Sequence, residues 1–213
     1  MKKVILAAAA ALLSLSLNAQ IFVGGQVGIT TNSNVNKLTN NTASTSDIVI
    51  APNAGYVFSD DFAAGVRVPI NFGSNGVNDK TFGIGVNPYA RYVIFRLGNF
   101  GISAEAGIRF NTTTETITTP NVAVRKITDT EIGIEVLPVL TYGLTDHITL
   151  EANLNIARLA FTNVSSKDAT TPNGGNENVT VDSSNTGFNL GANTNDVFGA
   201  GVGAVTIGFT YKF

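Results

Sequence analysis

The chain has 213 residues, a net charge of -2 and no cysteine or tryptophan. Only 13% of its residues are charged, about half the value usual in globular proteins, which indicates a protein whose largest surface does not lie in water. The near-neutral charge argues against nucleic acid as a partner, because that partner requires basic patches. The lack of cysteine excludes a disulfide framework and thiolate chemistry.

The first stretch of the chain has the features of a targeting segment. Two lysines give it a positive start, residues 4–17 form an apolar run, and Asn18-Ala19-Gln20 offers a cleavage site, although Leu17 is larger than the usual small residue two positions before the cut. The apolar run is too short to cross a bilayer as a helix. We therefore expect a signal peptide at residues 1–19, cleaved after Ala19, and a single domain at residues 20–213.

The rest of the chain alternates between polar segments and segments with an apolar residue at every second position. This period of two predicts β-strands with one apolar face. In the last segment, Val205, Ile207, Phe209, Tyr211 and Phe213 share one face, while mainly Gly, Thr and Ala occupy the other. In chain order, strands are predicted at residues 21–30, 48–58, 62–72, 82–92, 100–110, 130–142, 148–161 and 205–213.

These strands predict a barrel that crosses a membrane. No apolar run after the targeting segment is long enough for a spanning helix, and only a closed barrel satisfies the backbone of strands in lipid. We predict an all-β fold: a closed, antiparallel, up-and-down transmembrane β-barrel of about eight strands, with the apolar face toward lipid. Ten strands would fit if a long polar segment contained a further hairpin.

The connections alternate between long and short, as expected for outer loops and periplasmic turns. Outer loops are predicted at residues 31–47, 73–80, 111–129 and 162–186, of which the second is of medium length and the others are long. The third of these contains alternating pieces of its own, which fit a hairpin projecting above the membrane. Residues 188–203 fit either a loop or an extension of the last strand.

Aromatic residues bracket several predicted strands. Phe62 and Phe72 are ten residues apart, which is about 33 Å along a strand and about 25 Å of height at a tilt near 40°. That height matches the apolar band of a membrane barrel, so outer-membrane lipid is an expected partner. The predicted aromatic girdle consists of Phe62, Phe72, Phe82, Tyr92, Phe100, Phe110 and Tyr142.

Four stretches carry a resemblance to a known family. They are Asn87-Pro-Tyr-Ala-Arg-Tyr, Leu97-Gly-Asn-Phe-Gly-Ile-Ser-Ala-Glu-Ala-Gly, Tyr142-Gly-Leu-Thr-Asp and Gly208-Phe-Thr-Tyr-Lys-Phe. With them the chain resembles the small OmpA-like or OmpX-like barrels, especially the Bacteroidota-type outer membrane protein beta-barrel domain. The resemblance implies a bacterial outer-membrane location. It also implies that Phe209, Tyr211 and Phe213 form the signal by which the barrel-assembly machinery recognises the chain.

The strand pattern directs six charged residues toward the barrel interior. A buried charge without a partner is costly, so the three cations and three carboxylates are expected to form hydrogen-bonded ion pairs. We predict that they plug the lumen; a narrow or gated ion path lined by the same residues is the alternative. The set consists of Arg67, Arg91, Arg109, Glu105, Glu135 and Glu151.

No residue pattern points to an enzyme, a metal site or a cofactor. His147 is the only histidine; it lies beside Asp146 in a predicted periplasmic turn, the wrong end for chemistry on surface lipids, and is expected to be a polar turn residue. Asp168, Glu177 and Asp182 are expected to be solvated loop charges.

Three functions fit these features. The first is a structural or surface-interaction barrel of the outer membrane that presents its long loops to an unidentified ligand. The second is a narrow porin for small solutes. The third is a soluble ligand-binding barrel such as a lipocalin, which would require the reverse arrangement, with apolar residues inside and charges outside.

Overall fold

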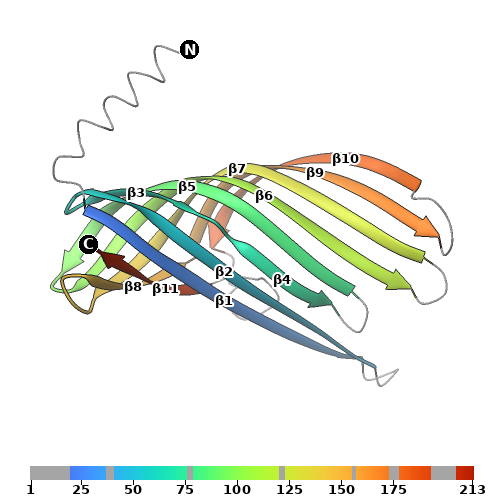
Figure 1. The fold of residues 1–213 in the computed structure, drawn as a ribbon, viewed down its shortest axis with the longest axis horizontal. Coiled ribbons are helices and arrows are strands. Elements are labelled where there is room, and N and C mark those ends of the chain that lie inside the picture. Colours follow the sequence, from blue (N-terminus) through green and yellow to red (C-terminus); the bar gives the residue numbers. More distant parts are fainter. Residues whose placement is uncertain are drawn as a thin grey trace, which may run out of the picture.

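A single antiparallel sheet makes up the structure and closes on itself into a barrel (Figure 1). The computed structural model describes residues 20–36, 41–75, 79–119, 123–154, 157–172, 178–192 and 205–213, so the predicted signal peptide lies outside the described residues. The strands are β1 Gln20–Asn36, β2 Asn41–Ser59, β3 Phe62–Arg67, β4 Ile70–Asn75, β5 Asp79–Leu97, β6 Phe100–Thr119, β7 Ala123–Gly143, β8 Ile148–Leu154, β9 Ala157–Pro172, β10 Asn178–Ala192 and β11 Val205–Lys212.

Eight strands complete the ring. In order they are β1, β2, β3, β5, β6, β7, β8 and β11, and β11 returns to β1. At this seam Phe22 lies opposite Lys212 and Val27 lies opposite Ile207. The predicted closed antiparallel β-barrel of eight strands is therefore confirmed. No helix in the described ranges is long and apolar enough to cross a membrane.

Segments β3 and β4 form one strand that a proline interrupts. Asn53 of β2 lies opposite Arg67, and Ile50 lies opposite Ile70, so the register is the same on both sides of the interruption. Pro69 stands between the two segments and has no N–H to donate to the ladder. The strand predicted at residues 62–72 is thus present with one local break.

The polar segments predicted as outer loops are mostly strand, so their prediction as loops is wrong, except for the hairpin that the sequence indicated at residues 111–129. Strands β6 and β7 stay paired until Thr119 faces Ala123, as the alternating pieces at residues 111–129 indicated, and β9 pairs with β10 across residues 162–186. Threonine is a good strand former on a partly exposed sheet, and a backbone ladder continues into water whatever the polarity of its side chains. Polar side chains therefore indicate where a strand leaves the membrane, and they do not indicate where the strand ends.

Two further boundaries differ from the prediction. The strand predicted at residues 148–161 consists of β8 and the start of β9, with residues 155–156 outside the described ranges. Residues 188–192 continue β10, while residues 193–204 lie outside the described ranges. The ambiguity at residues 188–203 is therefore settled only for its first five residues.

The two faces of the wall differ in polarity. Large apolar side chains are exposed on the outside, with Ile207 at 65% and Ile134 at 59%, whereas Glu105 inside retains 2%. Exposed apolar residues over a whole barrel surface are stable only in lipid. A lipocalin-like arrangement, with the apolar residues inside, is excluded.

Glycines make room for aromatic rings in the interior. The ring of Phe22 is buried, and a Cβ added at Gly55 would lie 2.7 Å from its Cζ atom. A Cβ added at Gly65 would lie 3.0 Å from the same atom and 3.0 Å from the hydroxyl of Tyr89. Inward glycines therefore allow two rings to fill the centre of a narrow barrel.

Candidate functional site: a charge network across the barrel interior

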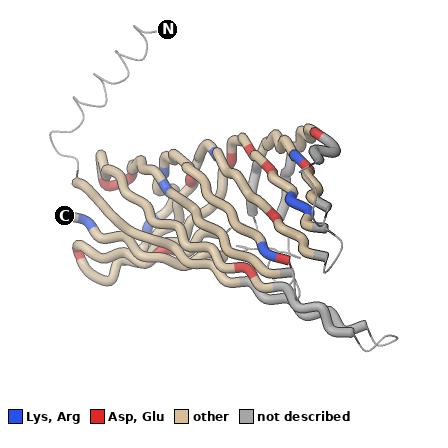
Figure 2. The backbone as a smooth tube through the Cα atoms, turned by 45° about the vertical axis from the view of Figure 1, so that its right-hand side comes forward, with Lys and Arg blue, Asp and Glu red and all other residues tan. Residues whose placement is uncertain are grey.

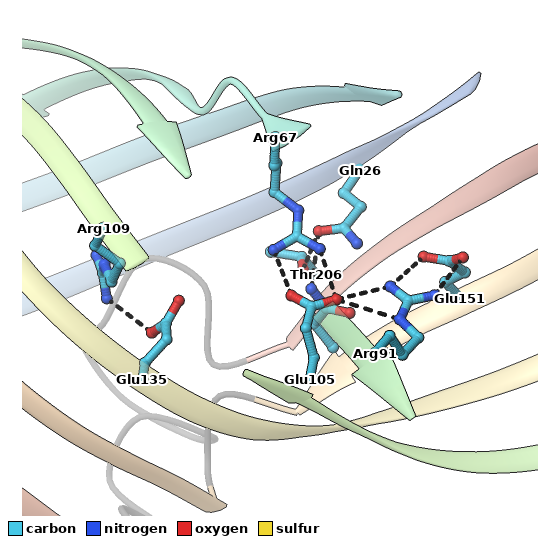
Figure 3. A network of polar contacts seen from close by, with 9 residues as sticks. Gln26, Arg67, Arg91, Glu105, Arg109, Glu135, Glu151 and Thr206 are labelled. Atoms are coloured by element: carbon cyan, nitrogen blue, oxygen red, sulfur yellow. Dashed lines mark hydrogen bonds and ion pairs between the residues drawn. The ribbon is translucent and has the colours of Figure 1, made fainter. Parts of the chain in front are cut away.

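Four charged side chains form one continuous hydrogen-bonded chain inside the barrel (Figure 3). Arg67 donates to both oxygens of Glu105, at 2.8 and 3.0 Å. Arg91 donates to Glu105 at 2.8 Å and to both oxygens of Glu151 at 2.7 and 3.0 Å. Two of the three contacts are thus bidentate, which is the strongest geometry available to an arginine and a carboxylate.

Two of the three contacts in this chain connect strands that are not neighbours in the ring. Arg67 ends β3 and Glu105 lies on β6, while Arg91 lies on β5 and Glu151 on β8. Arg91 therefore reaches past β6 and β7 to its partner. The side chains lie across the interior of the barrel, and their bonds tie opposite parts of the wall together.

The network is almost completely removed from solvent. Arg67, Glu105 and Glu151 retain 7%, 2% and 5% of their surface. Charges buried to this degree are stable only when paired and hydrogen-bonded. The Tyr89 ring adds a face for both cations, with its centroid 4.6 Å from the Cζ atom of Arg67 and 5.6 Å from that of Arg91.

Neutral polar residues on the closing strands bond to the network at one point and otherwise to one another. The Thr210 hydroxyl donates to Glu151 at 2.6 Å. Asn153 donates to the amide oxygen of Gln26 at 3.0 Å, and the Thr206 hydroxyl donates to the same oxygen at 3.3 Å (Figure 3). These contacts join β1, β8 and β11, so the seam of the barrel is held from inside as well as by its backbone.

Arg109 and Glu135 form a second, separate cluster. Arg109 donates to Glu135 at 3.2 Å, and its Nε atom lies 3.0 Å from a carboxylate oxygen of Glu131. No bond among the described residues joins this cluster to the first one. The six predicted lumenal residues therefore lie in two groups, of which the second includes a fourth carboxylate.

Several members of these clusters have inward parity in the sequence but are not among the six residues predicted to form the network. Glu131 has the same inward parity as Glu135, and Asn111 lies opposite it, so Arg109 is within reach. Thr210 and Gln26 are inward residues on strands whose outward faces are predicted correctly from the sequence. Parity was a sufficient signal for all three, but only the register shows which charge each one meets.

A cavity of about 330 Å³ lies between the network and the end of the barrel that holds the short turns. Arg91 and Glu151 line it on the network side. Asp60, Asp61 and Lys212 line it on the turn side. Open space inside the barrel therefore extends from the turn end as far as the ion pair of Arg91 and Glu151.

The predicted girdle residues all lie on the outer surface. Six of the seven form directly opposed pairs across neighbouring strands, such as Phe62 with Tyr92 and Phe100 with Tyr142 at the turn end. Phe72 and Phe82 face each other farther along, with ring centroids 5.6 Å apart. Phe110 is 46% exposed. Aromatic side chains at two levels of the wall are typical of the two interfaces of a membrane.

The aromatic residues of the last strand also face outward, with Phe209, Tyr211 and Phe213 all exposed. His147 contacts this strand: its Nδ1 atom lies 2.9 Å from the carbonyl oxygen of Lys212, and its ring stacks on Tyr211 at 5.7 Å. The histidine is therefore more than a polar turn residue. Its side chain holds the end of β11, the strand that closes the barrel, through these two contacts.

The remaining acidic residues do not gather into a site. Asp168, predicted to be solvated, accepts a hydrogen bond from Arg125 at 3.0 Å, and that bond holds the pKa of the Asp168 carboxyl below its ordinary value. Asp182 lies opposite Lys167, and Glu177 is outside the described residues. No group of three or more potential metal ligands occurs in the part of the chain that the structure describes.

These features define the class of protein. A closed eight-stranded barrel with an apolar outer wall, aromatic residues at two levels and paired charges inside is the architecture of a small transmembrane β-barrel of the bacterial outer membrane. This chain is such a barrel.

Solved structures support the assignment of the fold. The chain superposes on Neisserial surface protein A with a TM-score of 0.50 at 12% identity, covering 92% of this chain and 99% of that one. It superposes on the outer membrane protein OprG from Pseudomonas aeruginosa with a TM-score of 0.50 at 15% identity, covering 92% and 95%. No protein-family model matches the sequence, and no curated protein matches it.

Proposed function

We propose that this barrel is a non-conducting outer-membrane scaffold that presents its extracellular strands and loops at the cell surface. The observation that supports a closed interior best is the chain of bonds from Arg67 through Glu105 and Arg91 to Glu151. It runs from β3 to β8 across the lumen.

The energetics of the network support this plug. An ion that crosses the barrel has to separate bidentate ion pairs that are buried, and breaking such a pair leaves an uncompensated charge at a cost of about 3–5 kcal/mol. Phe22 and Tyr89 fill the same part of the interior. An eight-stranded barrel has no spare width to offer a second path.

The strands beyond the upper aromatic residues support a surface role. Strands β6, β7, β9 and β10 continue past Phe110 and Phe161 with threonine, serine and asparagine as their main side chains. A polar, ordered sheet in water offers a broad surface for contact with a partner. Neisserial surface protein A, which shares the fold, is by its name also a surface protein.

A narrow channel for small solutes is the second candidate, and the cavity of about 330 Å³ favours it. A solute can enter this cavity from the turn end as far as Arg91 and Glu151. Passage to the other side then requires the two side chains to separate. The two functions differ in whether that separation occurs under a membrane potential.

Planar-bilayer recording of the refolded mature chain tests the proposal. We expect no large, stable conductance steps from the wild-type protein. Arg91→Ala removes the central cation, widens the lumen and leaves Glu151 without its arginine, so we expect small cation-selective steps from this variant. Arg96→Ala is the matched control, since Arg96 lies in the exposed turn region and pairs with Asp61 there.

Large, stable steps from the wild-type protein would contradict the plug and establish the channel. Absence of conductance steps in both the wild-type protein and Arg91→Ala would show that the side chains around the network close the lumen even when the network is broken. The surface role is tested separately, by comparing the binding of labelled cells to the wild-type protein and to a variant in which residues 115–127 are replaced by a short turn. Equal binding by the two would contradict a role for this hairpin.

A further inference from the structure

Above the upper aromatic residues, most acidic side chains point inward and the lysines point outward. Figure 2 shows acidic and basic positions intermixed along the strands at the end of the barrel away from the C-terminus. The alternation of each strand separates them, because successive side chains point to opposite faces. The inward positions carry Asp79, Glu115, Asp129, Glu131 and Asp168, all partly buried, and one exposed cation, Arg125. The outward positions carry Lys80, Lys126 and Lys167, all exposed.

The register places these lysines on one continuous patch. Lys80 of β5 and Lys126 of β7 both lie directly opposite Thr116 of β6, one from each side. Lys167 of β9 lies opposite Thr128 in the adjacent row. We call this patch of Lys80, Thr116, Lys126, Thr128 and Lys167 the outer lysine patch.

The patch has almost no carboxylate of its own. None of its three lysines makes an ion pair with a described residue. The acids listed above are on the lumenal face of the same strands, where Arg109 pairs with Glu131 and Arg125 pairs with Asp168. Asp182, opposite Lys167 on β10, is the one outward carboxylate beside the patch among the described residues.

The patch begins at the level of the lipid headgroups. Lys80 is two residues beyond Phe82, and Lys167 is six residues beyond Phe161. At about 3.4 Å per residue and a tilt near 40°, these positions lie about 5 and about 15 Å above the aromatic residues that mark the edge of the apolar band. An outward side chain at this height faces the polar part of the outer leaflet, which in a bacterial outer membrane is a phosphorylated glycolipid.

We propose that the outer lysine patch binds the phosphate groups of the outer-leaflet glycolipid. Lysine ammonium groups attract clustered anionic headgroups and form charge-assisted hydrogen bonds to phosphate oxygens. The threonine hydroxyls between them are donors and acceptors suited to the sugar units. The proposal concerns the outer wall and is independent of whether the lumen conducts.

Native mass spectrometry of the refolded mature chain tests the proposal. The protein is titrated in detergent with a diphosphorylated lipid A and with the same lipid after removal of its phosphates. We expect the wild-type protein to retain the phosphorylated form selectively. In the triple variant Lys80→Gln, Lys126→Gln, Lys167→Gln, we expect the affinity for that form to fall by about fivefold for each lysine, with no change for the phosphate-free form.

Two further variants make the test specific. The double variant Arg96→Gln, Lys212→Gln removes positive charge at the turn end, and it should bind the phosphorylated lipid as the wild-type protein does. Asp182→Asn removes the carboxylate beside Lys167, and it should bind more tightly, which no loss of folding can mimic. Equal retention of both lipid forms by the wild-type protein, or an equal loss of binding in the triple variant and the turn-end variant, would overturn the proposal.

Discussion

Arg91 of β5 and Glu151 of β8 are joined by two nearly parallel hydrogen bonds, at 2.7 and 3.0 Å, across the interior of the barrel. Strands β6 and β7 lie between them in the ring. Bonds within the wall hold only neighbouring strands together, whereas this pair holds two that never touch. This buried contact therefore both holds distant parts of the barrel wall together and fills the lumen between them.

Glu105 is the centre of the network, and replacing it tests how far the network stabilises the fold. Glu105→Gln removes the charge that both Arg67 and Arg91 contact. We expect the free energy of unfolding to fall by about 3–5 kcal/mol, because a buried arginine is left without full compensation. Urea titration of the folded protein in detergent measures this change. The signal is circular dichroism or tyrosine fluorescence, since the chain has no tryptophan.

Asp61→Asn is the control for that measurement. Asp61 pairs with Arg96 at 3.5 Å, and both side chains are about half exposed. Exposed pairs contribute about 0–1 kcal/mol, so little change is expected. A similar loss in both variants would mean that the buried network has no special part in stability.

Gly55→Ala tests the space that glycine leaves inside the wall. The new methyl group would lie 2.7 Å from the Phe22 ring and 2.6 Å from the backbone of Gly65. Because a backbone atom cannot move aside as a flexible side chain can, we expect a loss of about 1–3 kcal/mol in the free energy of unfolding. Gly25→Ala is the matched control, since its methyl group would find the nearest atom at 3.9 Å, and it should leave the stability unchanged.

Much of this fold could be predicted from the period of the strands. A residue's parity decides whether it meets lipid or lumen, so Ile134 and Glu135 could be assigned to opposite faces without a structure. The same reasoning placed Arg67 and Glu105 inside, where the structure joins them. Gly98 shows that a turn can also be read locally, because its φ of 57° is one that glycine adopts without strain.

Two features of the structure could not be read in this way. The extent of the strands beyond Phe161 depends on pairing between backbones, and residues 162–171 carry no continuous apolar face to reveal it. The choice of partner for Arg109 depends on the stagger between β6 and β7, which brings Glu131 as close as Glu135. The two-residue period of a strand shows which face of the wall a side chain lies on. Only the register of the assembled strands shows which side chain it contacts.

Asp168 provides a test of the extracellular strands by pH. The hydrogen bond from Arg125 lowers the pKa of the Asp168 carboxyl from its ordinary value of 3.8. A carboxyl whose folded pKa lies below its unfolded pKa contributes stability above the unfolded value and loses that contribution as the pH falls through the folded value. We expect the β7–β9 contact to weaken only below about pH 4.

A carbon-detected NMR titration of the Asp168 carboxyl measures this pKa directly. Arg125→Gln should return it toward the ordinary value. High salt should have the same effect, since the pair is exposed and salt screens exposed pairs. An Asp168 pKa that is the same with and without Arg125 would show that the pair does not form in solution.

His147→Ala tests the attachment of the closing strand. The Nδ1–H group of the imidazole donates to the carbonyl oxygen of Lys212, and the ring stacks on Tyr211. The backbone of Lys212 in turn donates to the carbonyl oxygen of His147 at 2.8 Å, a bond that the substitution leaves in place. Losing one side-chain hydrogen bond and a stacked ring at an exposed site should therefore lower the free energy of unfolding by about 1 kcal/mol.

The loss should be local, because the neighbouring pairs of β11 with β1 and β8 are unchanged. Hydrogen exchange should accelerate at the amides of Lys212 and Phe213 and stay slow at Ile207, in the middle of the strand. Asp146→Asn, in the same turn but without a contact to β11, should leave all three amides as in the wild-type protein. Acceleration at Ile207 as well would show that the histidine supports the whole seam, since the end of the strand could not then open by itself.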